Sequence, residues 1–208
     1  NTRFKTSTNR APRKTTDGKP GEERELKIIL KVLADVGLVG LPNVGKSSIL
    51  ASISMATPKI ANYAFTTIHP NLGVVLINDY EKFVVADLPG LIVGASTGAG
   101  LGIQFLKHIS RTKLLLNVVD ISTNNLDKAL KDVDIIAKEL EDYDEDLGKK
   151  DKWYIFNKID LLDEKELKIL KKSINNKIKK NIFFVSAKEK SGLDEVCENI
   201  IEYLRDLQ

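Results

Sequence analysis

Eight consecutive residues, Gly40 to Ser47, carry the clearest chemical signal in the chain. Their sequence, G-L-P-N-V-G-K-S, matches the phosphate-loop pattern G-x-x-x-x-G-K-[ST]. Glycines at both ends permit a tight turn whose backbone N–H groups point at a polyphosphate, while Lys46 can reach the β- and γ-phosphates and Ser47 can coordinate Mg²⁺. A chance match in a glycine-containing turn is the alternative. The apolar run before the motif, residues 33–39, is typical of a buried strand and favours a nucleoside triphosphate site.

A second motif, D-L-P-G from Asp87 to Gly90, ends another apolar run. The Asp87 carboxylate can hold a water molecule of Mg²⁺, and the Gly90 N–H can donate to a γ-phosphate oxygen. Taken alone, D-x-x-G could also be a plain turn between a strand and a loop.

The third motif, N-K-I-D from Asn157 to Asp160, bears on base identity. The Asp160 carboxylate, placed edge-on to a purine, can accept hydrogen bonds from the N1–H and the exocyclic amine of guanine, whereas adenine presents an acceptor at N1. Lys158 can lay its methylene stem over the ring, and Asn157 can tie the base loop to the phosphate loop. Asp160 could instead cap the next helical segment, but that alternative does not explain why all four residues follow a strand.

A fourth motif, Ser186-Ala187-Lys188, ends the last apolar run, where a backbone N–H can meet the guanine O6.

The segments that must position these motifs alternate between strand-like and helix-like patterns, which predicts an α/β fold with a mainly parallel sheet covered on both faces. A short polar turn, residues 78–82, predicts that the second and third strands form an antiparallel hairpin. Ligands of such sheets bind at the carboxyl ends of the strands, so the motifs should converge there. The expected strands are 33–39, 72–77, 83–87, 114–120, 153–157 and 182–186, and the expected helices are 46–56, 102–110, 126–143, 164–174 and 193–207.

Size and charge set the outer limits of this prediction. With 208 residues and 42% hydrophobic content, the chain can bury one substantial core with an appendage. Its single cysteine, Cys197, excludes an internal disulfide and is expected in the core. No apolar run approaches the roughly 20 residues that span a bilayer, and no signal peptide is recognisable, so we expect a cytoplasmic protein. Residues 1–20 hold six basic residues against one acidic residue, which indicates a solvated tail more simply than a contact with RNA phosphates.

The four motifs, in this order, resemble those of the translation-factor-like GTPases, and within that class the chain is similar to the Obg family of ribosome-associated GTPases. The specific marks are Asn1 to Lys5, Thr8 to Pro12, Leu33 to Gly40, Phe65-Thr66-Thr67 followed by Pro70 to Gly73, and Asp87 to Ile92.

This resemblance implies a P-loop GTPase fold with a six-stranded, mostly parallel sheet, one antiparallel edge strand and helices on both faces. Residues 26–208 would be the GTPase domain, and residues 1–25 the end of the family's N-terminal domain with a linker. No C-terminal domain would follow Gln208. The implied partners are GTP and GDP, the stringent-response nucleotide ppGpp, and, for the full-length protein, the RNA and protein of the large ribosomal subunit. We expect a monomer.

The resemblance also assigns Thr67 as a switch residue that would coordinate Mg²⁺ through its hydroxyl and touch the γ-phosphate through its N–H; the residues alone leave Thr66 and Thr67 as alternatives. The catalytic group would be Lys46, Thr67, Gly90 and Asn43, and the Mg²⁺ ligands Ser47, Thr67 and Asp87. The full nucleotide-binding set would be Gly40, Pro42, Asn43, Val44, Gly45, Lys46, Ser47, Ser48, Phe65, Thr66, Thr67, Asp87, Gly90, Asn157, Lys158, Asp160, Ser186, Ala187 and Lys188.

Slow intrinsic hydrolysis is expected, because Leu91 stands where Ras-like enzymes have a water-orienting glutamine and no arginine finger is recognisable. By resemblance, Asn43 can hold K⁺ near the place of the missing arginine. The glycine-rich segment 90–102 should be the second switch, ordered by the γ-phosphate. An ATPase of a related family is disfavoured by N-K-x-D. A guanine-nucleotide sensor in which hydrolysis is secondary stays open as the alternative function.

Overall fold

The computed structural model describes residues 4–11, 13, 18, 20–25, 34–55, 58–60, 71–87, 112–179 and 181–207. The chain divides into two units, Asn1–Leu30 and Lys31–Gln208. In the first unit, Thr6 and Asn9 exchange two backbone hydrogen bonds of 3.2 Å, which close a short turn. The predicted helix at 102–110 and the predicted switch segment 90–102 lie outside the described residues.

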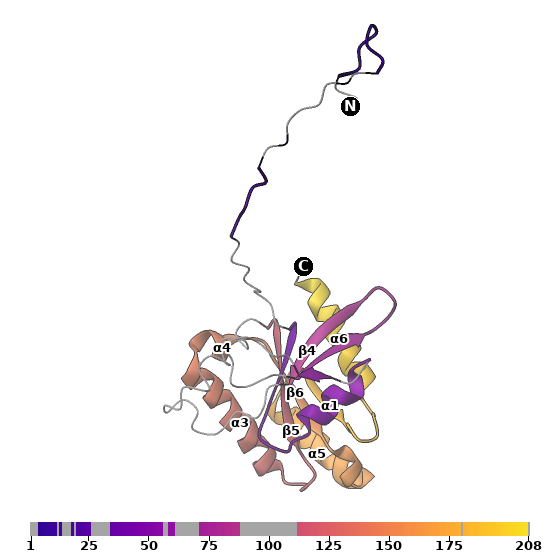
Figure 1. Ribbon diagram of the computed structural model, residues 1–208. Helices are drawn as coiled ribbons and strands as arrows, with labels where there is room; N and C mark the ends of the chain where they lie inside the picture. The colour runs from indigo at the N-terminus through magenta and orange to yellow at the C-terminus, as the bar shows by residue number, and fades with distance from the viewer. Residues whose placement is uncertain are drawn as a thin grey trace. The chain divides into compact units, whose positions relative to one another are not determined.

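The described strands of the second unit form one sheet (Figure 1), and their order in it is β2-β3-β4-β1-β5-β6-β7. Pairing is parallel from β4 through β1, β5 and β6 to β7, and antiparallel between β3 and β4 and between β2 and β3. The predicted hairpin is therefore confirmed. The strands are β1 Val36–Val39, β2 Lys59–Ile60, β3 Asn71–Leu76, β4 Lys82–Asp87, β5 Leu114–Asp120, β6 Lys152–Asn157 and β7 Ile182–Val185.

The two-residue strand β2 was not expected, and it places one more strand outside the antiparallel strand β3. Two residues are too few for a period-two pattern, so only pairing with Asn71 and Leu72 defines this strand. The described helices are α1 Lys46–Ile53, α3 Leu126–Tyr143, α4 Glu145–Lys149, α5 Glu164–Lys177 and α6 Leu193–Asp206, with a 3₁₀ turn, η3, at Ile159–Leu161. None of them is long and apolar enough to cross a membrane.

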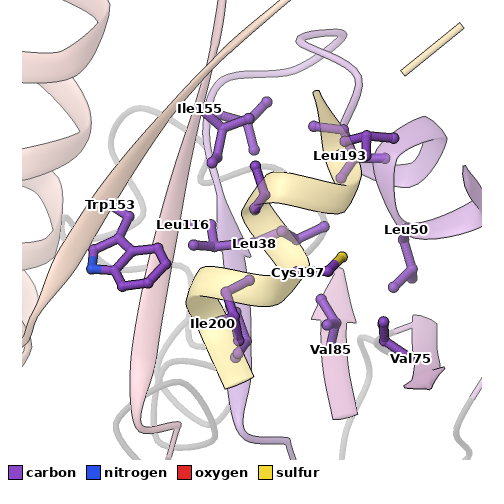
Figure 2. Packing of buried hydrophobic residues seen from close by; sticks show 14 of the residues in the cluster. Leu38, Leu50, Val75, Val85, Leu116, Trp153, Ile155, Leu193, Cys197 and Ile200 are labelled. Atoms are coloured by element: carbon purple, nitrogen blue, oxygen red, sulfur yellow. The ribbon is translucent and has the colours of Figure 1, made fainter. Parts of the chain in front are cut away.

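Both faces of the sheet carry helices, and each face has its own core. On one face, α1 and α6 pack on alternate residues of the central strands, such as Leu38 and Leu116. On the other face, α3 and α5 pack around Phe156, and α3 and α4 around Leu115. Figure 2 shows Cys197 on the side of α6 that faces Val75 and Val85. As predicted, this cysteine is a buried core residue, 7% exposed, and α6 lays Leu193, Val196, Cys197, Ile200 and Leu204 on the core.

The hairpin of β3 and β4 is held at its turn and also at the opposite end. The Asn78 side chain accepts hydrogen bonds from the backbone N–H groups of Tyr80 and Glu81, at 3.0 and 2.9 Å. Arg205, near the end of α6, donates to both carboxylate oxygens of Glu81, at 2.6 and 2.5 Å. At the opposite end of the pair, Asn71 lies across from Asp87, so the hairpin holds Asp87 at the carboxyl edge of the sheet.

Candidate functional site

The phosphate loop joins β1 to α1 with backbone conformations that its glycines supply. Gly45 has φ +100°, and a Cβ atom there would lie 2.3 Å from Nδ2 of Asn157. A side chain at this position is therefore excluded by both backbone strain and space. Because α1 begins at the next residue, the loop presents the N-terminus of a helix, where backbone N–H groups favour anions.

Lys46 lies inside the concave face of this loop. Its Nζ donates hydrogen bonds of 2.9 Å to the carbonyl oxygens of Gly40 and Leu41, and the residue is 6% exposed. Burial lowers the pKa of Lys46, although the nearby Asp87 carboxylate acts in the opposite direction. An anionic phosphate beside Lys46 would favour the ammonium form further.

Ser47 and Asp87 meet beside the loop and form a candidate metal-binding pair. The Ser47 hydroxyl donates a short hydrogen bond to Oδ2 of Asp87. Asp87 is only 3% exposed, and among the described residues its Oδ1 has no hydrogen-bond partner. A buried carboxylate oxygen without a partner, next to a hydroxyl, fits Mg²⁺, which prefers oxygen ligands and keeps several water molecules.

Asn157 connects three segments that lie far apart in the sequence. Its Nδ2 donates to the carbonyl oxygen of Val44 at 2.9 Å, and its Oδ1 accepts from the backbone N–H of Ala187 at 3.0 Å. The side chain is 2% exposed. The phosphate loop and the loop after β7 are therefore held together through the end of β6.

Lys158 adopts a left-handed backbone conformation, with φ +71°, at the start of η3. Its Nζ donates to the backbone carbonyl of Asn43 at 2.9 Å and to Oδ2 of Asp120. Asp120 also accepts a 2.8 Å hydrogen bond from the Ser122 N–H. Burial alone would raise the pKa of Asp120, but the bonds from Lys158 and Ser122 outweigh it and hold the pKa below its ordinary value.

Asp120, the last residue of β5, was not predicted from the sequence as a site residue, and it lies opposite Asn157 in the sheet register. Its position could have indicated a site residue, because a carboxylate ends a buried parallel strand there and the neighbouring strand ends in the N-K-I-D motif.

Asp160 lies in η3, where it accepts a 2.6 Å hydrogen bond from the Ser186 hydroxyl. It does not cap the next helix, because Asp163 caps α5 through a capping box with Glu166. Beside Asp160 lies a pocket of about 310 Å³. Its lining unites the phosphate loop and both base-side motifs: Gly45, Ser48, Asn157, Lys158, Asp160, Leu161, Ala187 and Lys188.

The remaining predicted residues have less defined places. Pro42 and Asn43 are exposed on the phosphate loop, Asn43 with φ +63°, and no hydrogen bond of the Asn43 side chain occurs among the described residues. Phe65, Thr66, Thr67, Gly90 and Leu91 lie outside the described residues.

Comparison with known proteins agrees with this arrangement. The sequence model of the family described as 50S ribosome-binding GTPase matches residues 35–158, more than half of the chain. Era from Aquifex aeolicus, in a structure with GDP and AlF₄⁻, has 26% sequence identity and a TM-score of 0.59 over 82% of this chain and 56% of the Era chain. An Era structure with MgGDPNP and nucleotides 1506–1542 of 16S ribosomal RNA has 26% identity and a TM-score of 0.58, over 81% and 55% of the two chains.

The G domain of the T. maritima FeoB iron transporter has a TM-score of 0.60 over 81% of this chain and 97% of its own, but its identity of 24% relates the two by fold alone. This chain spans little more than half the length of the Era chains. The predicted fold class, an α/β P-loop GTPase fold, is confirmed. Since the family match includes the whole phosphate loop, Asp87, Asn157 and Lys158, the chain belongs to the 50S ribosome-binding GTPase family.

Proposed function

We propose that this chain is the GTP-binding and GTP-hydrolysing switch domain of an Obg-type protein, which acts in the cytoplasm in assembly of the large ribosomal subunit. The observation that carries the proposal is the Asn157 side chain, which joins the phosphate loop to the loop after β7 and lines the 310 Å³ pocket. A nucleotide can place its phosphates and its base on one connected frame there.

Guanine is the base that this pocket favours. Ser186 holds one oxygen of Asp160, and no hydrogen bond to the other oxygen occurs among the described residues. The Asp160 carboxylate can accept the two donors on the guanine edge, and the Ala187–Lys188 backbone can meet its O6. Asp120 fixes the end of Lys158, so that its methylene stem can cover the ring.

At the phosphate end, the side chains supply charge and position more than covalent chemistry. Lys46 would donate to the β- and γ-phosphates, and Gly90 to the γ-phosphate. Ser47, Thr67 and Asp87 would hold Mg²⁺. When bound, Mg²⁺ would neutralise part of the charge on the phosphate oxygens.

Hydrolysis is expected to be slow, because the apolar Leu91 cannot orient water. The exposed Asn43 amide is available to hold K⁺, which would add positive charge near the phosphates. This role for Asn43 rests on the resemblance to related GTPases and on the absence of other hydrogen bonds to its side chain in the described residues.

The ribosomal partner is supported by the family and by Era, which was solved with a fragment of 16S ribosomal RNA. Era's RNA belongs to the small subunit, whereas the Obg-like marks at Phe65 to Thr67, Pro70 to Gly73 and Asp87 to Ile92 favour the large subunit. We also infer that residues 1–25 are the end of an Obg N-terminal domain and that 26–208 form the GTPase domain, which acts as a monomer.

A guanine-nucleotide sensor that responds to GDP, GTP or ppGpp is the second candidate, and Leu91 favours it. Two measurements test the proposal. Competition among GTP, GDP, ppGpp, ATP and xanthosine triphosphate should favour guanine nucleotides, and preference for ATP would refute the assignment. Turnover with purified large subunits should exceed turnover with small subunits; equal, unstimulated turnover would favour the sensor, and stimulation by small subunits alone would favour an Era-like role.

A further inference from the structure

The outer edge of β3 has hydrogen-bonding groups that the sheet does not use. The Ile77 N–H bonds the Glu81 carbonyl at 3.0 Å, so alternate residues, including Val74 and Leu76, direct their main-chain groups away from β4. The Met55 N–H donates a hydrogen bond of 3.1 Å to the Val74 carbonyl, and β2 pairs with the start of β3, at Asn71 and Leu72. Among the described residues, nothing pairs with the outward main-chain groups of Leu76. The outward main-chain groups of this one residue can therefore bond a residue of an extended segment from another chain.

A cavity of about 320 Å³, which we name the edge groove, lies beside this edge. Its walls come from α1, β3 and α6: Ser52, Ile53, Val75, Leu76, Ile77, Asp194, Cys197 and Glu198. Val75 and Cys197, 2% and 7% exposed, form a buried apolar floor, and the partly buried Ile53 and Ile77 lie beside it, but more of the accessible lining is polar than apolar. Burial, with Asp194 and Glu198 nearby, raises the pKa of Cys197 to about 12, so its thiol stays neutral. The floor of the edge groove can therefore contact one apolar side chain, while Ser52, Asp194 and Glu198 present polar groups around it.

Two carboxylates give the edge groove a negative rim. Asp194 and Glu198 are exposed, lie four residues apart on α6, and form no ion pair among the described residues. Like charges at this spacing repel each other on a helix, and a cation placed between them relieves the repulsion. The same carboxylates repel phosphate, which disfavours nucleic acid as the occupant. A second copy of this chain, paired edge to edge, would bring two more carboxylates to the same side.

We propose that the outer edge of β3 and the edge groove form a docking site for an extended, lysine- or arginine-rich segment of a partner protein. The segment would pair with the main chain of Leu76 and insert one apolar side chain into the edge groove. Its neighbouring basic side chain would lie between Asp194 and Glu198. None of the groove residues lines the nucleotide pocket, so the docking site and the nucleotide site can be occupied together.

The test uses short synthetic peptides of alternating valine and lysine, added to the ¹⁵N-labelled full chain in the presence of Mg²⁺ and GDP. The lysine peptide should shift the amide signals of residues 74–77 and 194–198. A valine–glutamate peptide, and a lysine peptide N-methylated at alternate residues so that it cannot pair with a strand, should leave them in place. Shifts confined to other residues, or equal shifts with the N-methylated peptide, would overturn the proposal.

Charge reversal provides a matched pair of variants on one helix. The double variant Asp194→Lys, Glu198→Lys should weaken binding of the lysine peptide at least about tenfold. The control Glu195→Lys, Glu202→Lys makes the same charge change at exposed α6 positions outside the edge groove, and should leave the Kd within about twofold. Equal weakening in both pairs would indicate general charge attraction and refute the docking site. If sedimentation showed that the chain forms a dimer through this edge, a second copy would be the occupant, and the proposed docking of a partner protein would be refuted.

Discussion

Replacing Asn157 with alanine removes the side chain that joins the two loops of the nucleotide site. The variant strands the Val44 carbonyl and the Ala187 N–H, which the Asn157 amide bonds at 2.9 and 3.0 Å in a site that is 2% exposed. A stranded buried polar group costs about 1–3 kcal/mol. The two groups together would cost about 2–6 kcal/mol, and because water can reach part of the space that the amide leaves, we expect the free energy of unfolding to fall by about 2–4 kcal/mol.

For a chain of this size, that loss corresponds to a fall in Tm of roughly 5–15 °C. The affinity for GDP should also fall at least about tenfold, because the nucleotide must then order the two loops itself. Urea unfolding without nucleotide and calorimetric titration with GDP and Mg²⁺ measure the two effects separately.

Asn117 offers a matched control on the neighbouring strand β5. It is also a buried asparagine, 1% exposed, but its Oδ1 has no hydrogen-bond partner among the described residues, and it does not line the nucleotide pocket. Asn117→Ala should change stability with little effect on GDP affinity. If both variants weakened GDP equally, or if Asn157→Ala bound GDP normally, the connecting role of Asn157 would be refuted.

Four further predictions concern the base, the γ-phosphate, the monovalent cation and pH. Asp160→Asn should weaken GTP by about 1.5–3 kcal/mol, near a tenfold to hundredfold change, and favour xanthosine triphosphate; unchanged preference in a competition assay would contradict the base assignment. Thr67→Ala should keep GDP affinity and lose single-turnover hydrolysis. Hydrolysis by the unmodified chain should rise when K⁺ replaces Na⁺ at constant ionic strength, and Asn43→Ala should abolish that difference. Equal rates of the unmodified chain in both salts would remove Asn43 from the mechanism. The pKa of Asp120 is depressed in the folded state. Its contribution to the free energy of unfolding is therefore present above its unfolded pKa of about 4 and is lost as pH falls through the folded pKa. Asp120→Asn should accordingly make the free energy of unfolding fall less steeply at acid pH than it does in the unmodified chain.

The main elements were predictable because their residues carry strong local patterns. The apolar face of α6 repeats at helical spacing, and the motifs at Asp87, Asn157 and Ser186 follow apolar runs that could only be strands of one sheet. Convergence of these motifs then follows from parallel pairing, since the carboxyl ends of parallel strands share one edge.

The ends of elements depended on tertiary contacts that the sequence does not display. We expected the first helix to reach Ala56, but α1 ends at Ile53, Ser54 is extended, and the Met55 N–H bonds Val74 on β3. A hydrogen bond to a distant strand thus replaces the helical continuation that residue preference alone favours.

Asp120 was missed for a related reason. A single aspartate after an apolar run is common at turns, where it bonds nearby backbone N–H groups, and Asp120 does bond Ser122 in this way. Its second bond, to Lys158, depends on the left-handed conformation at Lys158 and on the neighbouring positions of β5 and β6. Neither is visible in the sequence near Asp120.

The antiparallel pair of Asn71 with Asp87 has a consequence for cooperativity. Thr67 precedes Asn71 by four residues, and Gly90 follows Asp87 by three. The two residues proposed to sense the γ-phosphate are therefore connected, through short stretches of chain, to the two members of one cross-strand pair. A displacement of Asn71 or Asp87 caused by nucleotide binding is therefore passed to the other residue through the strand pairing. The effects of Thr67→Ala and of a substitution at Gly90 on hydrolysis should accordingly be non-additive, and a variant that loosens the Asn71–Asp87 end of the hairpin should make them additive.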